Sequence, residues 1–137
     1  TYLKPRECLC NIVNCSGVCL FGYLSTYVEC VPEFLSAVTG LKWGLPEALE
    51  VGERISNMRQ AFNIREGINL VKTHFPPRAL GIPPLEHGPT GGFSVDRDLI
   101  LSEYLNAMDW SHEDGRPSRE KLLELGMADI AQDLYPA

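Results

Sequence analysis

Four of the five cysteines lie close together near the N-terminal end of the chain: Cys8, Cys10, Cys15 and Cys19. Thiolates are preferred ligands of soft metals and iron–sulfur clusters, and they also support redox chemistry. Gly17 comes just before the dipeptide Val18-Cys19 and has no side chain, so the backbone there can approach a bound group closely. We therefore expect any cofactor chemistry to take place at this stretch.

The spacing of the cysteines limits what they can do by themselves. Cys8 and Cys10 are separated by one residue, where a mutual disulfide would be strained, and five is an odd number. Reduced thiols in a reducing compartment fit this pattern better than a secreted disulfide framework. No C-x-x-C pair occurs, which counts against a zinc ribbon or a self-contained iron–sulfur cluster.

Free cysteines are often buried as small apolar side chains. We expect burial for the following four: Cys8, Cys10, Cys15 and Cys30. Cys19 is the exception, because the residues around it predict a functional role.

Length and composition indicate one globular domain and exclude several classes of protein. The 137 residues are 45% hydrophobic and 22% charged, as is typical of a single folded domain. A net charge of −6 without any basic run argues against a nucleic-acid partner. No run of 18 apolar residues occurs, so no membrane span is predicted. His74, His87 and His112 fall in predicted loops without ligand spacing, and no G-x-S-x-G or phosphate-loop motif is present.

The apolar periodicity predicts an all-α, mostly helical single domain with helices or helical turns over residues 18–28, 31–39, 46–66, 96–108, 119–125 and 128–134. In the longest of these, the residues spaced for one buried face are Val51, Ile55, Met58 and Phe62. Gly52 inside this helix costs about 1 kcal/mol relative to alanine. Its presence therefore predicts either that packing compensates for this cost or that a neighbouring element approaches closely.

Residues 69–94 are rich in proline and glycine, a composition that excludes a long helix or a central strand. We expect an ordered, extended loop that wraps the domain surface, because loops of this length in small domains usually have a role. Its predicted apolar anchors are Leu80, Ile82, Leu85 and Phe93.

Three blocks of the sequence resemble one known family. Residues 14–20 read Asn-Cys-Ser-Gly-Val-Cys-Leu and resemble the D-x-x-G-L-C-x motif of the aldehyde ferredoxin oxidoreductase family. Residues 52–67 are similar to the family's G-E-R-x-x-N-x-x-R-x-F-N-x-R-E-G signature. Residues 76–89, followed by 115–117 and 121–126, are similar to its C-terminal tail. The blocks occur in the family's order over nearly the whole chain, which is thus identified as resembling a C-terminal domain.

The resemblance implies a function and a set of site residues. Members of the family oxidise aldehydes to carboxylic acids at a tungsten or molybdenum bis-pterin centre beside a [4Fe–4S] cluster, and ferredoxin accepts the electrons. Carried over, Cys19 would be the fourth cluster ligand, and iron prefers a thiolate. Asn14, Gly17 and Val18 would line one pterin. The resemblance assigns no catalytic residue to this chain.

In the family, the other three cluster cysteines and the substrate-facing residues lie upstream. Because the chain opens on Thr1 without a methionine, we expect residues 1–137 to be the helical C-terminal fragment of a longer cytoplasmic enzyme. Its partners would be the remainder of that enzyme, ferredoxin and a small aldehyde-type substrate, and a homodimer is allowed. Alone, the chain is expected to hold no iron and no tungsten and to be inactive.

Departures from the family pattern keep two alternatives open. Asn14 replaces an aspartate, Val18 replaces a leucine, and Gln60 replaces an arginine while Arg59 stands one place earlier. We expect Glu53 and Arg59 to be solvated charges. The chain could instead be a helical interaction or subunit module that has lost the cofactor, or a thiol- or zinc-binding module built on the four clustered cysteines.

Overall fold

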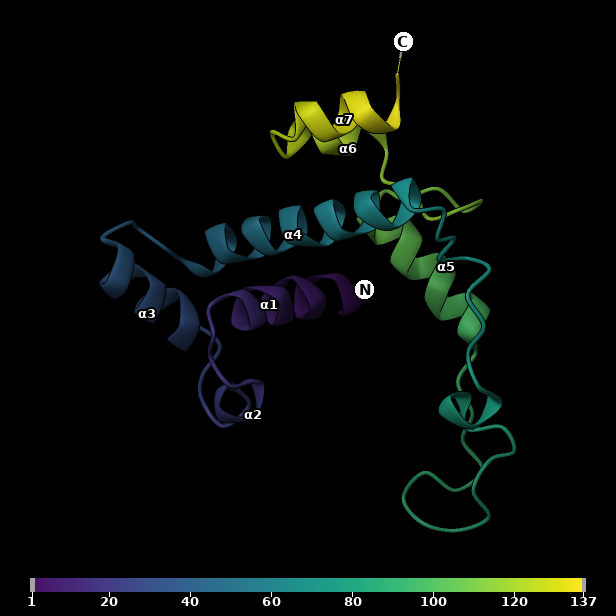
Figure 1. The fold of residues 1–137 in the computed structure, drawn as a ribbon. Coiled ribbons are helices and arrows are strands. Elements are labelled where there is room, and N and C mark those ends of the chain that lie inside the picture. Colours follow the sequence, from purple (N-terminus) through teal and green to yellow (C-terminus); the bar gives the residue numbers. More distant parts are fainter. Residues whose placement is uncertain (1, 137) are drawn as a thin grey trace.

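One long helix, α4 (Leu45–Arg65), is the axis on which the other elements pack (Figure 1). The computed structural model describes residues 2–136, and the elements in that range are α1 (Leu3–Cys15), α2 (Leu20–Tyr23), α3 (Cys30–Thr39), α4, the 3-10 helix η1 (Pro77–Leu80), α5 (Arg97–Met108), α6 (Arg119–Glu124) and α7 (Ala128–Leu134). These residues contain no β-strand, only two isolated bridges. The predicted all-α class is confirmed. No helix among them is both long and apolar enough to cross a bilayer.

Local chemistry sets the ends of most helices. The side chain of Glu47 accepts a 2.9 Å hydrogen bond from the backbone N–H of Gly44 at the start of α4. The side chains of Asp96 and Ser118 accept hydrogen bonds from first-turn N–H groups of α5 and α6. Gly40 ends α3 with a φ of +71°. These capping residues explain why the predicted boundaries of α3 to α7 lie within a residue or two of those observed.

The predicted helix over residues 18–28 is wrong, because only the four residues of α2 are helical there. After Tyr23 the backbone turns, and the hydroxyl of Thr26 donates a 2.8 Å hydrogen bond to the Tyr23 carbonyl. Such side-chain bonds compete with helix continuation. The 13-residue helix α1 was not predicted. Its signal was the four-residue spacing of Cys8 and Ile12, which both lie buried against the core.

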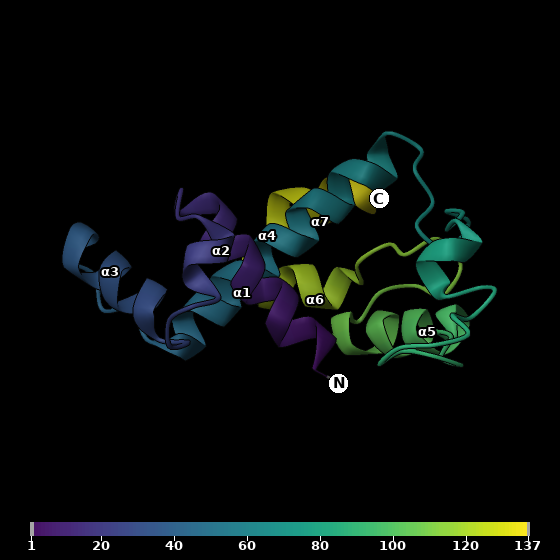
Figure 2. The same cartoon turned by 90° about the horizontal axis from the view of Figure 1, so that it is seen from below.

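α1 packs along α4, and small residues make this possible (Figures 1 and 2). A Cβ atom added to Gly52 would lie 2.1 Å from the carbonyl oxygen of Cys8, so the two backbones nearly touch there. The close approach predicted from Gly52 is confirmed. The predicted buried face of α4 is confirmed for Val51 and Ile55, which pack against the cluster of α1 and α3. It is wrong for Met58 and Phe62, which are each more than half exposed. The fully buried positions of α4 carry small and polar residues, including Ala48 and Ser56.

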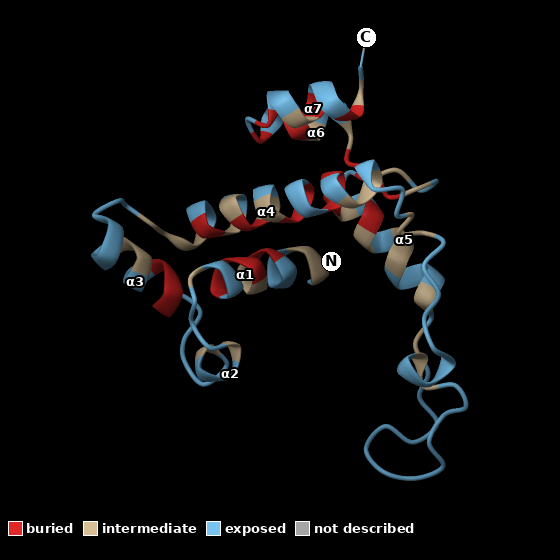
Figure 3. Cartoon of the chain, viewed as in Figure 1, coloured by how far each residue is buried: buried red, intermediate tan, exposed pale blue. Residues whose placement is uncertain are grey.

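The core consists of three small clusters distributed along α4 (Figure 3). The first holds α6 and α7 against the end of α4 and contains Ala61, Leu122, Leu125, Met127, Ala131 and Leu134. The second joins α1 to α3 through Ile12, Val13 and Val31. The third, around α5, contains Leu105, Met108 and Trp110. Large parts of the surface between these clusters remain apolar and exposed.

The segment rich in proline and glycine extends away from the helices instead of wrapping them (Figure 1). Backbone hydrogen bonds order it, among them Val95 N–H to Leu80 O at 2.8 Å. The predicted order is therefore observed, but the predicted anchoring is wrong for Ile82, Leu85 and Phe93, which are exposed. The helical core ends at α5, so it offers these side chains no surface to cover.

Candidate functional site

The residues singled out by the first motif form one continuous turn between α1 and α2. Asn14 lies in the last turn of α1, and Ser16 closes that helix by donating its N–H to the Ile12 carbonyl at 2.9 Å. Gly17 then adopts a φ of +76°, a left-handed conformation that side chains disfavour. Cys19 precedes α2 in an extended conformation, and its carbonyl accepts from Tyr23 N–H at 2.9 Å.

All four predicted site residues lie on the surface of the turn. Asn14, Gly17 and Cys19 are exposed, and Val18 is 37% exposed. No atom outside its chain neighbours lies within 4 Å of a Cβ placed on Gly17, so the space above that glycine is open. Cys19 is a free thiol. These features suit a bound group that reaches the turn from outside the chain. The turn offers it one soft ligand, one amide side chain and an unobstructed backbone.

The cysteines do not form a common metal site. Among residues 2–136, no three His, Cys, Asp or Glu side chains are grouped so as to hold a metal ion. Cys8 and Cys30 are buried, as predicted, and Cys10 is partly buried. Cys15 is exposed, so its predicted burial is wrong. It is the last residue of α1.

Burial gives Cys8 a distinct acid–base behaviour. It raises the pKa of the Cys8 thiol from 9.0 to about 11, and the nearby carboxylate of Glu53 adds to the shift. A raised folded-state pKa means that the thiol's contribution to stability is complete below pH 9 and is lost as the pH rises towards 11. We expect the free energy of unfolding to fall over this interval, and to fall less in Cys8→Ala. An identical slope in both proteins, measured by urea denaturation at several pH values, would contradict this assignment.

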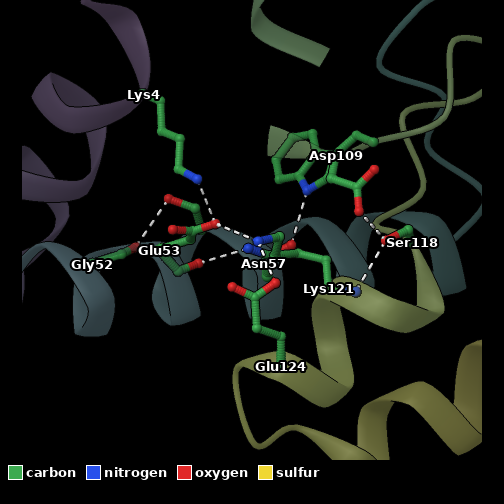
Figure 4. A network of polar contacts seen from close by, with 10 residues as sticks. Lys4, Gly52, Glu53, Asn57, Asp109, Ser118, Lys121 and Glu124 are labelled. Carbon is green, nitrogen blue, oxygen red and sulfur yellow. Dashed lines mark hydrogen bonds and ion pairs between the residues drawn. The ribbon is translucent and has the colours of Figure 1, made fainter. Parts of the chain in front are cut away.

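The second motif lies on α4, where its Glu53 is paired with lysines of two neighbouring helices (Figure 4). Glu53 Oε1 lies 2.7 Å from Lys4 Nζ on α1 and 3.8 Å from Lys121 Nζ on α6. Lys121 also contacts Glu124 at 2.6 Å, and hydrogen bonding to that carboxylate raises the pKa of Lys121. The prediction that Glu53 is a solvated charge is wrong, since its side chain is only 14% exposed. Glu53 ties three helices together.

The two positions that depart from the family signature also have structural partners. The Gln60 side chain is buried and donates a 3.0 Å hydrogen bond to the Gly115 carbonyl. Arg59 is exposed, as predicted, and it also donates from Nη1 to Asn11 Oδ1 at 2.8 Å. Asn11 in turn donates to Ser56 Oγ at 2.8 Å, which links α1 to α4 beneath the predicted site. Asn11 was not singled out from the sequence, because α1 itself was not predicted.

A cavity of about 660 Å³ opens between α1, α5 and residues 70–80, and none of the four predicted site residues lines it. Its walls are mainly apolar, with Arg6, Glu7 and Arg97 at the polar positions. Burial, together with the neighbouring Glu7, raises the pKa of Tyr104 in its wall. Cys10 lines the cavity one turn of α1 before Asn14, so cavity and turn adjoin along the same helix.

The histidines are surface residues, as predicted. His74, His87 and His112 are all exposed. His112 Nε2 lies 2.7 Å from Asn106 Oδ1, a contact that holds the turn after α5.

Structure and sequence together define an all-helical domain that carries an exposed cysteine motif. Comparison with known proteins identifies its family. Residues 1–127 match the model described as aldehyde ferredoxin oxidoreductase, domains 2 and 3. The chain belongs to the aldehyde ferredoxin oxidoreductase family. The resemblance drawn from the three sequence blocks is confirmed.

Curated relatives support the same assignment. The chain is 31% identical over 122 residues to a tungsten-containing aldehyde ferredoxin oxidoreductase of Pyrococcus abyssi, and 31% identical to one of Thermococcus kodakarensis. A similar protein of Pyrococcus furiosus is 30% identical. In each case the match covers 89% of this chain and 20% of the relative. The chain therefore spans about a fifth of the length of the curated relatives it matches.

Proposed function

We propose that this chain forms the C-terminal part of a tungstopterin, iron–sulfur aldehyde oxidoreductase, in which Cys19 is the fourth ligand of a [4Fe–4S] cluster. Asn14, Gly17 and Val18 line one pterin of the adjacent metal centre. The observation that carries this proposal is the joint exposure of all four motif residues on one turn, with Cys19 a free thiol at its end. A ligand buried inside the chain could not complete a cluster held mainly by other polypeptide.

The residues of this chain bind and orient the cofactors and take no chemical step. When bound, a tungsten or molybdenum bis-pterin centre would supply the oxidation of an aldehyde to a carboxylic acid, with ferredoxin as electron acceptor. The Cys19 thiolate would hold iron of the cluster. The amide of Asn14 both donates and accepts hydrogen bonds, whereas the aspartate of the motif only accepts. Gly17 leaves the backbone open to close approach. Exposed free thiols suit a reducing compartment such as the cytoplasm.

The two alternatives receive less support. A zinc or thiol module would need the clustered cysteines to converge, yet Cys8 is buried while Cys15 and Cys19 are exposed. An interaction module without a cofactor rested on Asn14 and Gln60. The hydrogen bond of Gln60 to Gly115 explains that departure by packing within the chain, so it does not count against a cofactor.

Differential alkylation tests the ligand assignment. The experiment uses a chimera of the P. abyssi relative, in which this chain replaces the matched 122 residues. We expect Cys19 to resist iodoacetamide in the iron-loaded chimera and to react once iron has been removed by oxidation and chelation, because a coordinated thiolate is not free to attack. In the isolated chain Cys19 should react throughout. Cys15 is the internal reference, and its labelling should not depend on iron. Equal labelling of Cys19 with and without iron would refute the assignment.

A further inference from the structure

The segment around and after Cys19 presents apolar side chains that no other part of residues 2–136 covers. We call it the α2 flank and define it as Val18, Phe21, Leu24, Tyr27 and Val28. Each of these side chains is between 37% and 80% exposed. Scattered exposed apolar residues are ordinary, but here five of eleven consecutive positions carry one. The segment around α2 is mostly exposed (Figure 3), and such a concentration is typical of an interaction site.

The core already takes up other side chains of this segment. Leu20 and Tyr23 of α2 pack against the cluster formed by α1 and α3. Phe21 in α2 and Leu24, the residue after it, are 80% and 68% exposed. These two side chains therefore remain available to a partner.

The sequence around the flank has no charges. Residues 8–28 contain no Asp, Glu, Lys, Arg or His, although 22% of the whole chain is charged. A solvated loop at the surface of an acidic protein would ordinarily carry charged side chains. This stretch of 21 uncharged residues is exposed mainly over residues 14–28. It therefore resembles the central part of a protein–protein interface, where charged residues are depleted.

The position of the flank beside Cys19 indicates what covers it. This step rests on the proposed function. One cluster is held by four cysteines, and no group of three ligand side chains is found among residues 2–136. The polypeptide that brings the other three thiolates must therefore approach Cys19 closely. Val18 and Phe21 lie one residue before and two residues after Cys19, so they meet whatever approaches.

From these observations we propose that the α2 flank is the docking surface for the part of the same enzyme that carries the remaining cluster ligands. The chain spans only 20% of the length of its curated relatives, which leaves ample polypeptide to cover the flank. Burial of the flank accounts for its lack of charge, and its place next to Cys19 puts the docked polypeptide beside the cluster.

Hydrogen exchange in the chimera tests the proposal. We expect amides of residues 20–28 to exchange at least about tenfold more slowly in the chimera than in the isolated chain, as in a buried interface. Peptides from α6 should exchange at similar rates in both, because α6 lies on the opposite side of α4 from α2 (Figure 1). Unchanged exchange over residues 20–28 would overturn the proposal.

Substitutions separate docking from ligation. Phe21→Ser with Leu24→Ser should abolish the protection, whereas Leu123→Ser, a matched exposed leucine on α6, should leave it unchanged. Cys19→Ser should lose iron and keep the protection. If Cys19→Ser keeps its iron while the flank stays protected, the proposed function fails and the docking surface stands. If iron depends on Cys19 but the flank is unprotected, the docking proposal fails alone.

Two further measurements cover other outcomes. If the chimera does not accumulate, the truncated relative and a tagged copy of this chain are co-expressed as separate polypeptides. Co-purification that is lost in Phe21→Ser with Leu24→Ser supports the proposal, and no co-purification of the unaltered chain overturns it. Sedimentation of the isolated chain tests for a homodimer. A dimer that the same double substitution dissociates would identify a second copy as the occupant and overturn the proposal.

Discussion

Gly52→Ala is expected to lower the free energy of unfolding by about 3 kcal/mol, the upper end of the range for overpacked cores. The added Cβ would lie 2.1 Å from the Cys8 carbonyl oxygen, 2.5 Å from its carbonyl carbon and 2.7 Å from its Cα. All three are backbone atoms, so α1 must move as a whole. Helix propensity alone would predict the opposite sign, a gain of about 1 kcal/mol. The change also reaches the site, because α1 carries Asn14 at its far end.

Gly22→Ala is the matched control for this prediction. Gly22 is also helical, and a Cβ there meets only the Cys19 Cβ, at an ordinary contact distance of 3.8 Å. Its stability should stay within about 0.5 kcal/mol of the unaltered chain. Urea denaturation followed by circular dichroism measures both variants. A Gly52→Ala protein as stable as the unaltered chain would show that α1 and α4 do not pack as described.

Asn57→Leu is expected to cost about 2–3 kcal/mol, because it leaves a buried donor without an acceptor. Asn57 is fully buried in α4, and its Oδ1 accepts a 2.8 Å hydrogen bond from the indole N–H of Trp110 (Figure 4). Its Nδ2 donates to the Glu53 carbonyl at 2.9 Å. Leucine is similar in size but accepts no hydrogen bond. Trp110, which is 6% exposed, has no access to water as a substitute.

A double-mutant cycle isolates this hydrogen bond. In a Trp110→Phe background the indole donor is absent, so Asn57→Leu should cost at least about 1 kcal/mol less than in the unaltered chain. Thermal or urea unfolding of the four proteins gives the coupling energy. Strictly additive costs would show that the two side chains do not interact, and would remove the structural reason for an asparagine in this part of the family signature.

Helix ends were predictable from the sequence, whereas the buried face of α4 was predictable only in part. Gly40, Asp96 and Ser118 act locally, through backbone conformation and first-turn hydrogen bonds, so their effect can be recognised without tertiary information. The face of α4 depends on its neighbour. α1 lies so close at Gly52 that only small residues fit, and the large apolar residues Met58 and Phe62 are left on the outside.

The candidate site was predictable as a motif but not as a surface. The spacing of Asn14, Gly17 and Cys19 formed one of the three blocks that carried the family resemblance, and the family match confirms that resemblance. Spacing could not indicate that Cys15 is exposed, or that the following residues leave an uncovered apolar flank. Both depend on where α1 ends and on which side of α2 meets the core.

The iron content of the chimera tests the central claim most directly. The claim is that the Cys19 thiolate, and no other thiol of this chain, holds iron. We expect about four iron atoms per chain in the unaltered chimera and in Cys15→Ser, as in a complete [4Fe–4S] cluster. Cys19→Ser should retain clearly less, with its helical circular dichroism unchanged. A full complement of iron in Cys19→Ser, or an equal loss in Cys15→Ser, would contradict the claim.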